Sequence, residues 1–142
     1  MDSERRFCTF FVGGLWFGIE VESVREVLRG QPVTRVPLAP AEIAGLINLR
    51  GQIVTLMDLR LRLKLPPRSV DHAAMNLVLS NEGGGVSLLV DDVGEVVEAP
   101  EDRYETMPES LPAEARKLVP GVYKLPERLL HVLVLDAVVA PP

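Results

Sequence analysis

Short apolar runs, separated by glycine, proline and polar residues, recur along most of this chain. Residues 9–12 and 15–21 flank Gly13-Gly14, which is the pattern of a tight β-hairpin. The same reasoning predicts further strands at 43–48, 52–57, 76–80, 86–90, 93–98, 118–124 and 129–135. Because no stretch has the length and the 3.6-residue period of a long amphipathic helix, the pattern indicates an all-β fold of small barrels or a sandwich.

Two segments depart from this simple series. Residues 23–28 are compatible with one helical turn. Residues 58–65 alternate apolar and basic side chains, and a period of two predicts a half-buried edge strand. Within and just after this segment we expect a solvated basic face rather than a docking surface, made by Arg60, Arg62, Lys64 and Arg68. The expected aromatic core consists of Phe10, Phe11 and Phe17, with Trp16 as a packed strand aromatic.

An internal repeat is visible at a separation of 69 residues. Residues 19–28 match residues 88–97, and the identical pairs are Val21/Val90, Val24/Val93, Glu26/Glu95 and Val27/Val96. Later in the chain, residues 45–49 resemble residues 121–125, and each is followed by an apolar strand that ends near an aspartate, Asp58 or Asp136. Two matches in the same order predict two similar lobes that share apolar surface, because each lobe alone would be a marginal domain.

The composition narrows the class of protein further. The 142 residues are 47% hydrophobic and 25% charged, which is ordinary for a globular chain and disfavours disorder. The net charge of −5 argues against nucleic-acid binding, and no apolar run approaches a membrane span. Residues 1–70 carry a net +3 and residues 71–142 a net −8, which reflects either simple solubility or two halves that face oppositely charged partners.

Catalytic and metal-binding patterns find little support. His72 lies in a polar loop, and His131 lies in an apolar strand where a packed histidine is the simpler interpretation. Cys8, the single cysteine, is a small apolar strand residue and excludes an internal disulfide, which favours the cytoplasm. Asp91-Asp92 is more typical of a turn cap than of an acid–base pair, and Gly83-Gly84-Gly85 joins two strands, so it does not suit a phosphate site. We therefore expect no enzyme, no metal and no cofactor.

Arg50 stands at the turn between two predicted strands, residues 43–48 and 52–57. A hairpin turn needs a residue that accepts a positive φ, which Gly51 supplies, but it does not need arginine. In the internal repeat, Pro126 occupies the position that would match Arg50, whereas Glu95 matches Glu26. This asymmetry favours a specific role for Arg50, although simple divergence of the two copies also explains it.

The stretch from Gly45 to Gly51 reads Gly-Leu-Ile-Asn-Leu-Arg-Gly, and Ile53-Val54 and Asp58-Leu59-Arg60 follow it. These residues resemble the signature of the CheW family, whose members couple chemoreceptors to the histidine kinase CheA. The resemblance extends over nearly the whole chain. It implies two intertwined five-stranded SH3-like barrels with short helical turns. One of these turns would fall within residues 58–65, where the alternation of apolar and basic residues predicts a strand instead.

The implied domain organisation is a single domain over residues 1–142, made of two pseudo-repeated lobes. One lobe is expected around residues 15–70 and the other around 75–135, with the termini exchanged between them. The resemblance also implies a site that takes the receptor tip and contacts the kinase, lined or shaped by Val24, Glu26, Val27, Gly45, Arg50 and Gly51. From the residues alone, the two valines are better explained as core, and backbone geometry alone is an alternative explanation for the two glycines.

By resemblance, the chain is therefore a non-enzymatic adaptor between a chemoreceptor cytoplasmic tip and the regulatory domain of CheA. Other CheW-like proteins in the same array are possible partners; nucleic acid and direct membrane insertion are not expected. The implied location is the cytoplasm, at membrane-associated receptor arrays. Alternatives are a small-metabolite-binding barrel, a small barrel-fold hydrolase that would use Asp91 or Asp92, and a role in pilus motility or development rather than flagellar chemotaxis.

Overall fold

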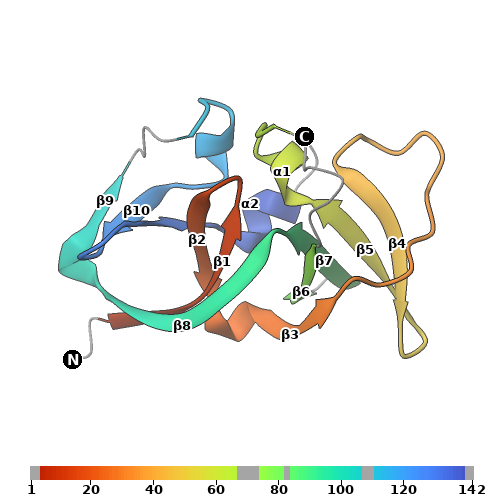
Figure 1. Ribbon diagram of the computed structural model, residues 1–142, viewed down its shortest axis with the longest axis horizontal. Helices are drawn as coiled ribbons and strands as arrows, with labels where there is room; N and C mark the ends of the chain where they lie inside the picture. Colours follow the sequence, from red (N-terminus) through yellow and green to blue (C-terminus); the bar gives the residue numbers. More distant parts are fainter. Residues whose placement is uncertain (1–3, 67–73, 82–83, 107–110, 140–142) are drawn as a thin grey trace.

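Two β-sheets make up most of the protein in a computed structural model (Figure 1), which confirms the all-β prediction. The structure describes residues 4–66, 74–81, 84–106 and 111–139. The first sheet has six strands, in the spatial order β8 (Asp92–Pro100), β1 (Glu4–Val12), β2 (Leu15–Glu20), β11 (Leu129–Val132), β10 (Gly121–Lys124) and β9 (Tyr104–Thr106). The second has five, in the order β3 (Val24–Arg29), β6 (Met75–Asn81), β7 (Gly84–Val90), β5 (Gln52–Asp58) and β4 (Ile43–Leu49).

Short helical segments connect some of these strands. They are η1 (Val21–Ser23), α1 (Leu59–Arg62), η2 (Glu101–Arg103), η3 (Ala115–Lys117) and α2 (Leu135–Val139). In each sheet the strands at the two ends of the spatial order follow one another in the chain: β8 precedes β9, and β3 precedes β4. A connection between opposite edges requires each sheet to curl, as Figure 1 shows for both.

The two sheets share one pairing scheme. Each contains an edge strand, an antiparallel hairpin, one parallel pair and a second hairpin; the parallel pairs are β2 with β11 and β5 with β7. The chain passes from one sheet to the other after β2 and again after β7, and these crossings are the segments that match at 69 residues in the sequence. The expected lobe boundary near residue 70 does not coincide with a change of sheet, because β6 and β7 belong with β3, β4 and β5.

The largest apolar core lies between the sheets. Phe10 and Phe17 of the first sheet, whose rings stack at 5.7 Å, belong to the same buried cluster as Leu77, Leu79 and Leu88 of the second. Phe11, which was expected in the core, is only half-buried. Each sheet also has a smaller buried cluster made of its own residues. Because the largest cluster draws residues from both sheets, the packing of each sheet depends on the presence of the other.

The segment 58–65 is a short helix and not the edge strand that its alternation predicts. The side chain of Asp58 caps α1 by accepting a hydrogen bond from the backbone N–H of Arg60 at 3.0 Å. Leu59 and Leu63, four residues apart, are fully buried, so the apolar period that packs is the helical one. The sequence alternates because two further leucines, Leu61 and Leu65, lie between and after the buried ones and are themselves only half-buried.

The predicted helical turn at residues 23–28 is also wrong. Only Val21–Ser23 form a turn of 3-10 helix, and β3 begins at Val24. Along β3, half-buried and exposed side chains alternate, which is the period of a strand with one packed face. Sequence reasoning missed β9, which has only three residues, and it placed the start of β10 three residues too early.

Candidate functional site

The turn between β4 and β5 holds an arginine in a conformation that favours glycine. The backbone φ is 53° at Arg50 and 86° at Gly51, as a two-residue hairpin turn with both central residues left-handed requires. The N–H of Gly51 donates to the Asn48 side-chain oxygen at 2.9 Å, which fixes the turn. The left-handed conformation costs an L-residue about 1–2 kcal/mol, and glycine or asparagine adopts it more readily. The turn therefore carries an arginine at a position where the backbone alone would favour one of those two residues.

The guanidinium of Arg50 forms an ion pair with the carboxylate of Glu26 on β3. The Arg50 side chain is 70% exposed and that of Glu26 is 23% exposed, so one partner faces solvent while the other is largely covered. Nearby, Arg25 Nη1 donates to Gln52 Oε1 at 3.3 Å. These contacts join β3, at one edge of the second sheet, to the β4–β5 hairpin at the other edge, and so link the two sides of the curled sheet.

The two predicted valines have different surroundings. Val24 is half-buried and packs against the core shared by the sheets, whereas Val27 is 40% exposed on β3. Val27 therefore offers apolar surface on the exposed face of β3, whereas Glu26 belongs to the half-buried face of the same strand. Val24 contributes to the stability of the strand that carries them.

Gly45 has a structural task. A Cβ at this position would lie 2.4 Å from the carbonyl oxygen of Thr34. Thr34 and Leu46 exchange two backbone hydrogen bonds, each of 2.8 Å, so the segment before β4 runs directly against the strand. Gly45 is required for this close approach and lies away from the ion pair, toward the other end of β4.

Sequence reasoning did not single out two other exposed apolar residues, one on each sheet. Val96 on β8 is 48% exposed, and the internal repeat could have pointed to it because its position matches that of Val27. Ile53 pairs with Asn48 across the β4–β5 hairpin and is also exposed. Both sheets thus present an exposed valine on an edge strand that follows a crossing of the chain.

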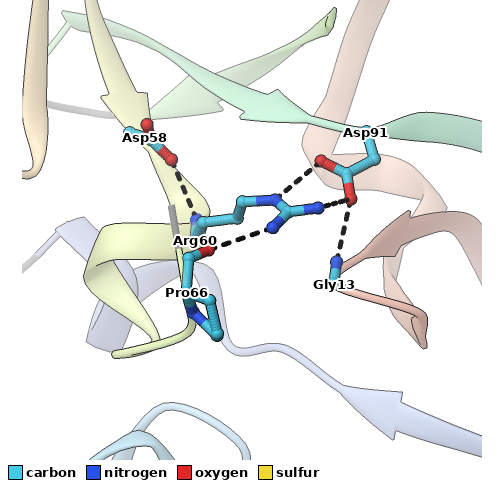
Figure 2. A network of polar contacts seen from close by, with 5 residues as sticks. All are labelled: Gly13, Asp58, Arg60, Pro66 and Asp91. Carbon is cyan, nitrogen blue, oxygen red and sulfur yellow. Dashed lines mark hydrogen bonds and ion pairs between the residues drawn. The ribbon is translucent and has the colours of Figure 1, made fainter. Parts of the chain in front are cut away.

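A second arginine, Arg60, forms a largely buried network that holds the sheets together (Figure 2). Its Nε and Nη2 atoms donate to the two oxygens of Asp91 at 3.0 and 2.6 Å, and the Asp91 carboxylate also accepts from the N–H of Gly13 at 2.8 Å. Asp91 lies where the chain leaves β7 for β8. Its hydrogen bond to the β1–β2 turn agrees with the expected role as a cap, and its hydrogen bond to Arg60 raises the pKa of that guanidinium.

The basic residues around α1 do not form the solvated face that the sequence predicts. Arg60 is paired with Asp91, and Arg62 donates to the carbonyl oxygens of Val138 at 3.0 Å and Ala137 at 3.1 Å in α2. Lys64 is exposed, 4.0 Å from Glu114, and Arg68 lies outside the described residues. The two arginines bind groups from other elements because α1 lies at the junction of the sheets.

The remaining titratable candidates are structural. His131 is buried, its Nδ1 lies 2.9 Å from the carbonyl oxygen of Trp16, and burial lowers its pKa. Burial likewise raises the pKa of the Cys8 thiol, which disfavours the reactive thiolate. His72 lies outside the described residues. Among the residues that the structure describes, no group of three or more histidine, cysteine or acidic side chains could hold a metal ion, and no helix is long and apolar enough to cross a membrane.

Known proteins resemble the chain over nearly its whole length. Residues 6–141 match the family model of the CheW-like domain. The chemotaxis protein CheW of Klebsiella aerogenes is 31% identical over 126 residues, which cover 89% of this chain and 76% of that protein. The chemotaxis protein CheW of Bacillus subtilis is 29% identical over 133 residues, with coverage of 94% and 85%. Protein FrzA of Myxococcus xanthus is 39% identical over 56 residues, which cover 39% of this chain and 35% of FrzA.

A solved structure shows the same fold. The crystal structure of the scaffolding protein TtCheW from Thermoanaerobacter tengcongensis superimposes with a TM-score of 0.81 at 26% sequence identity. The match covers 92% of this chain and 89% of that one. The arrangement of the two sheets is therefore shared by a protein with a scaffolding role.

Proposed function

The chain belongs to the CheW-like domain family, and from this premise we propose that it is a non-enzymatic adaptor that couples chemoreceptors to the histidine kinase CheA. One observation carries the proposal at the level of residues. The mostly exposed guanidinium of Arg50, held in a left-handed turn, pairs with Glu26 on β3, and the exposed face of the same strand carries Val27. A strand that holds a planar cation and also exposes apolar surface suits recognition of a protein helix that carries both carboxylate and apolar side chains.

The proposed receptor site uses the edge strands of both sheets. Val27 on β3 and Val96 on β8 are exposed, and both strands begin where the chain crosses from one sheet to the other. An amphipathic helix of the receptor tip would place apolar side chains at intervals of three and four residues against these valines. Glu26 would hold Arg50 in position and Gly51 would complete its turn, while Gly45 would shape the other end of β4, where the preceding segment runs against the strand.

The proposed partners are the receptor cytoplasmic tip and the regulatory domain of the kinase, with other CheW-like proteins in the same array. The proposed location is the cytoplasm, at receptor arrays on the membrane. Each contact can be weak, because clustering raises avidity by roughly 10²–10⁴ without new contacts. The adaptor would change kinase activity only as far as it binds one kinase state more tightly than another.

The test is direct binding of the purified chain to two probes, a soluble coiled-coil receptor tip and the isolated CheA regulatory domain. We expect Arg50→Glu to weaken binding of the receptor tip and to leave the melting temperature nearly unchanged. The charge-exchange variant, Glu26→Arg with Arg50→Glu, measures whether the two residues are coupled. A chain that bound neither probe, or whose melting temperature rose only with a small metabolite, would contradict the adaptor role.

A further inference from the structure

The turn between β10 and β11 ends on an arginine that is held by aromatic rings instead of by an acid. Leu125 N–H donates to the carbonyl oxygen of Arg128 at 3.2 Å, which closes the turn just before β11. The guanidinium carbon of Arg128 lies over the Trp16 ring, 4.2 Å from its centroid, and 5.2 Å from the centroid of Phe11. Among the residues that the structure describes, this guanidinium forms no ion pair and donates no hydrogen bond, whereas three other arginines are each paired with a carboxylate.

The two rings hold the guanidinium and leave its donors available. Phe11 and Trp16 lie opposite each other on β1 and β2, so the aromatic support of Arg128 is itself part of the sheet. A cation over an aromatic face is attracted by the ring and does not use its N–H groups in that contact. A planar guanidinium positioned in this way is ready to bind a carboxylate through two parallel hydrogen bonds.

The indole of Trp16 supplies a second unused donor. Trp16 is only 9% exposed, and its indole N–H has no hydrogen-bond acceptor in the part of the chain that the structure describes. A buried indole N–H normally finds an acceptor. Two such donors on neighbouring side chains, one of them charged, indicate an acceptor that a ligand supplies.

A hollow of about 350 Å³ lies at the same place. Trp16, Leu125 and Pro126 form its apolar wall, and Glu127 and Arg128 add one charge of each sign. This volume is at the lower end of the range for small-molecule sites. A peptide strand would find no free backbone to pair with here, because β2 and β11 each have a neighbouring strand on both sides. The hollow therefore suits a small molecule with an apolar body better than an extended peptide.

We propose that this hollow binds a small monocarboxylic acid with an apolar body. The carboxylate of the ligand accepts hydrogen bonds from the Arg128 guanidinium and the Trp16 N–H, and its apolar body lies against Leu125 and Pro126. The exposed carboxylate of Glu127 on the same wall repels a second negative charge, which disfavours dicarboxylates. The site belongs to the first sheet and the Arg50 turn to the second, so the proposal goes beyond the adaptor function and does not depend on it.

Hexanoate is a suitable probe, because it joins one carboxylate to an apolar chain. Trp16 is the single tryptophan of the sequence, so its fluorescence reports on this hollow alone. We expect hexanoate to change the emission in a saturable way. Its affinity should exceed by about tenfold or more those of acetate, which lacks the apolar chain, and of hexylamine, which carries the opposite charge.

The decisive variant is Arg128→Gln, which removes the cation from an exposed side chain. We expect it to weaken hexanoate binding by about tenfold or more and to leave the melting temperature nearly unchanged. Lys124→Gln is the matched control, because it removes a cation of the neighbouring strand that is paired with Glu105 at 3.1 Å and does not line the hollow. This control should change the affinity by about twofold at most. Trp16→Phe keeps an aromatic ring but loses the N–H, and calorimetry should show weaker hexanoate binding.

Several outcomes would contradict the proposed site. It is wrong if hexanoate binds no better than acetate or hexylamine, or if Arg128→Gln binds hexanoate as the wild type does. Equal losses in Arg128→Gln and Lys124→Gln would indicate general attraction of anions and no site at the hollow. If Trp16→Phe binds as tightly as the wild type, the role of the indole N–H is wrong. If Arg128→Gln also weakens binding of the receptor tip, the hollow is part of the receptor site, and a separate ligand site is wrong.

Discussion

At the scale of the residue, Arg50 combines two properties that usually exclude each other. Its backbone lies in the left-handed region, while its side chain is long, charged and mostly exposed. The sequence singled out this residue because a hairpin turn does not need arginine. The family resemblance implied that Glu26 lies near it, whereas the residue pattern alone could not, because β3 and the β4–β5 turn approach each other only after the sheet has curled.

The contribution of the Arg50 side chain can be separated from that of its backbone with Arg50→Asn. Asparagine tolerates a positive φ, so the turn should persist, and loss of a largely exposed ion pair changes the free energy of unfolding by about 0–1 kcal/mol. Chemical denaturation should show this small change, while receptor-tip binding falls as it does for Arg50→Glu. A collapse of stability in Arg50→Asn would show that Arg50 is mainly structural.

For Gly45 we expect the opposite result from that for Arg50, because its substitution should mainly lower the stability of the fold. An added Cβ would lie 2.4 Å from the Thr34 carbonyl oxygen, and its φ of 151° is one that L side chains rarely adopt. We expect Gly45→Ala to destabilise the protein by about 1–3 kcal/mol in urea denaturation. Gly14→Ala is a suitable control: its φ is also positive, but its Cβ would meet nothing within 4 Å, so it should cost less.

At the scale of the element, the short helix α1 shows where sequence patterns mislead. Alternation of apolar and basic residues favoured a strand, and the same residues pack as a helix because Asp58 caps it and Leu59 and Leu63 bury one side. Arg60 donates to Asp91, which lies 31 residues away in the sequence. Arg62 donates to Ala137 of α2, which lies 75 residues away. Such distant partners leave no local signal, whereas the hairpins and their glycine turns do.

The buried ion pair at α1 gives the second stability prediction. The side chains of Arg60 and Asp91 are only 16% and 10% exposed, so Asp91→Asn leaves a guanidinium without its countercharge. We expect a loss of about 3 kcal/mol, near the lower end of the range for breaking a buried pair. Lys64→Gln, which removes an exposed cation 4.0 Å from Glu114, is the control and should change stability by less than about 1 kcal/mol. Equal effects of the two variants in denaturant titrations would contradict this assignment.

At the scale of the whole molecule, the residue pattern predicted the all-β class and two related sets of strands. How the two sets share their strands was implied only by the family resemblance, as an exchange of termini between the lobes. The repeat at 69 residues marks the crossings between sheets, and it was visible because both crossings use the same residue types. Which sheet receives β1 and β2 depends on tertiary pairing with β8 and β11. No local pattern encodes that choice.

The buried His131 links stability of the whole molecule to pH. Burial lowers its pKa below the ordinary histidine value of about 6.5, so the unfolded chain takes up a proton at a higher pH than the folded one. The stabilising effect of a neutral His131 is therefore complete above about pH 6.5 and is lost as the pH falls through the lowered folded pKa. Thermal melts from pH 7.5 to 5 should show a steeper acid decline for the wild type than for His131→Gln, and parallel curves would contradict it.

The exchange of strands between the sheets sets an order of assembly during synthesis. The strands of the second sheet all lie within residues 24–90, so they leave the ribosome together and can pair early. The hairpin β1–β2 is made first, yet both of its neighbours, β8 and β11, come from residues 92–132. This hairpin, which precedes the other strands of both sheets, must therefore wait, with its apolar side unshielded, until β11 has emerged.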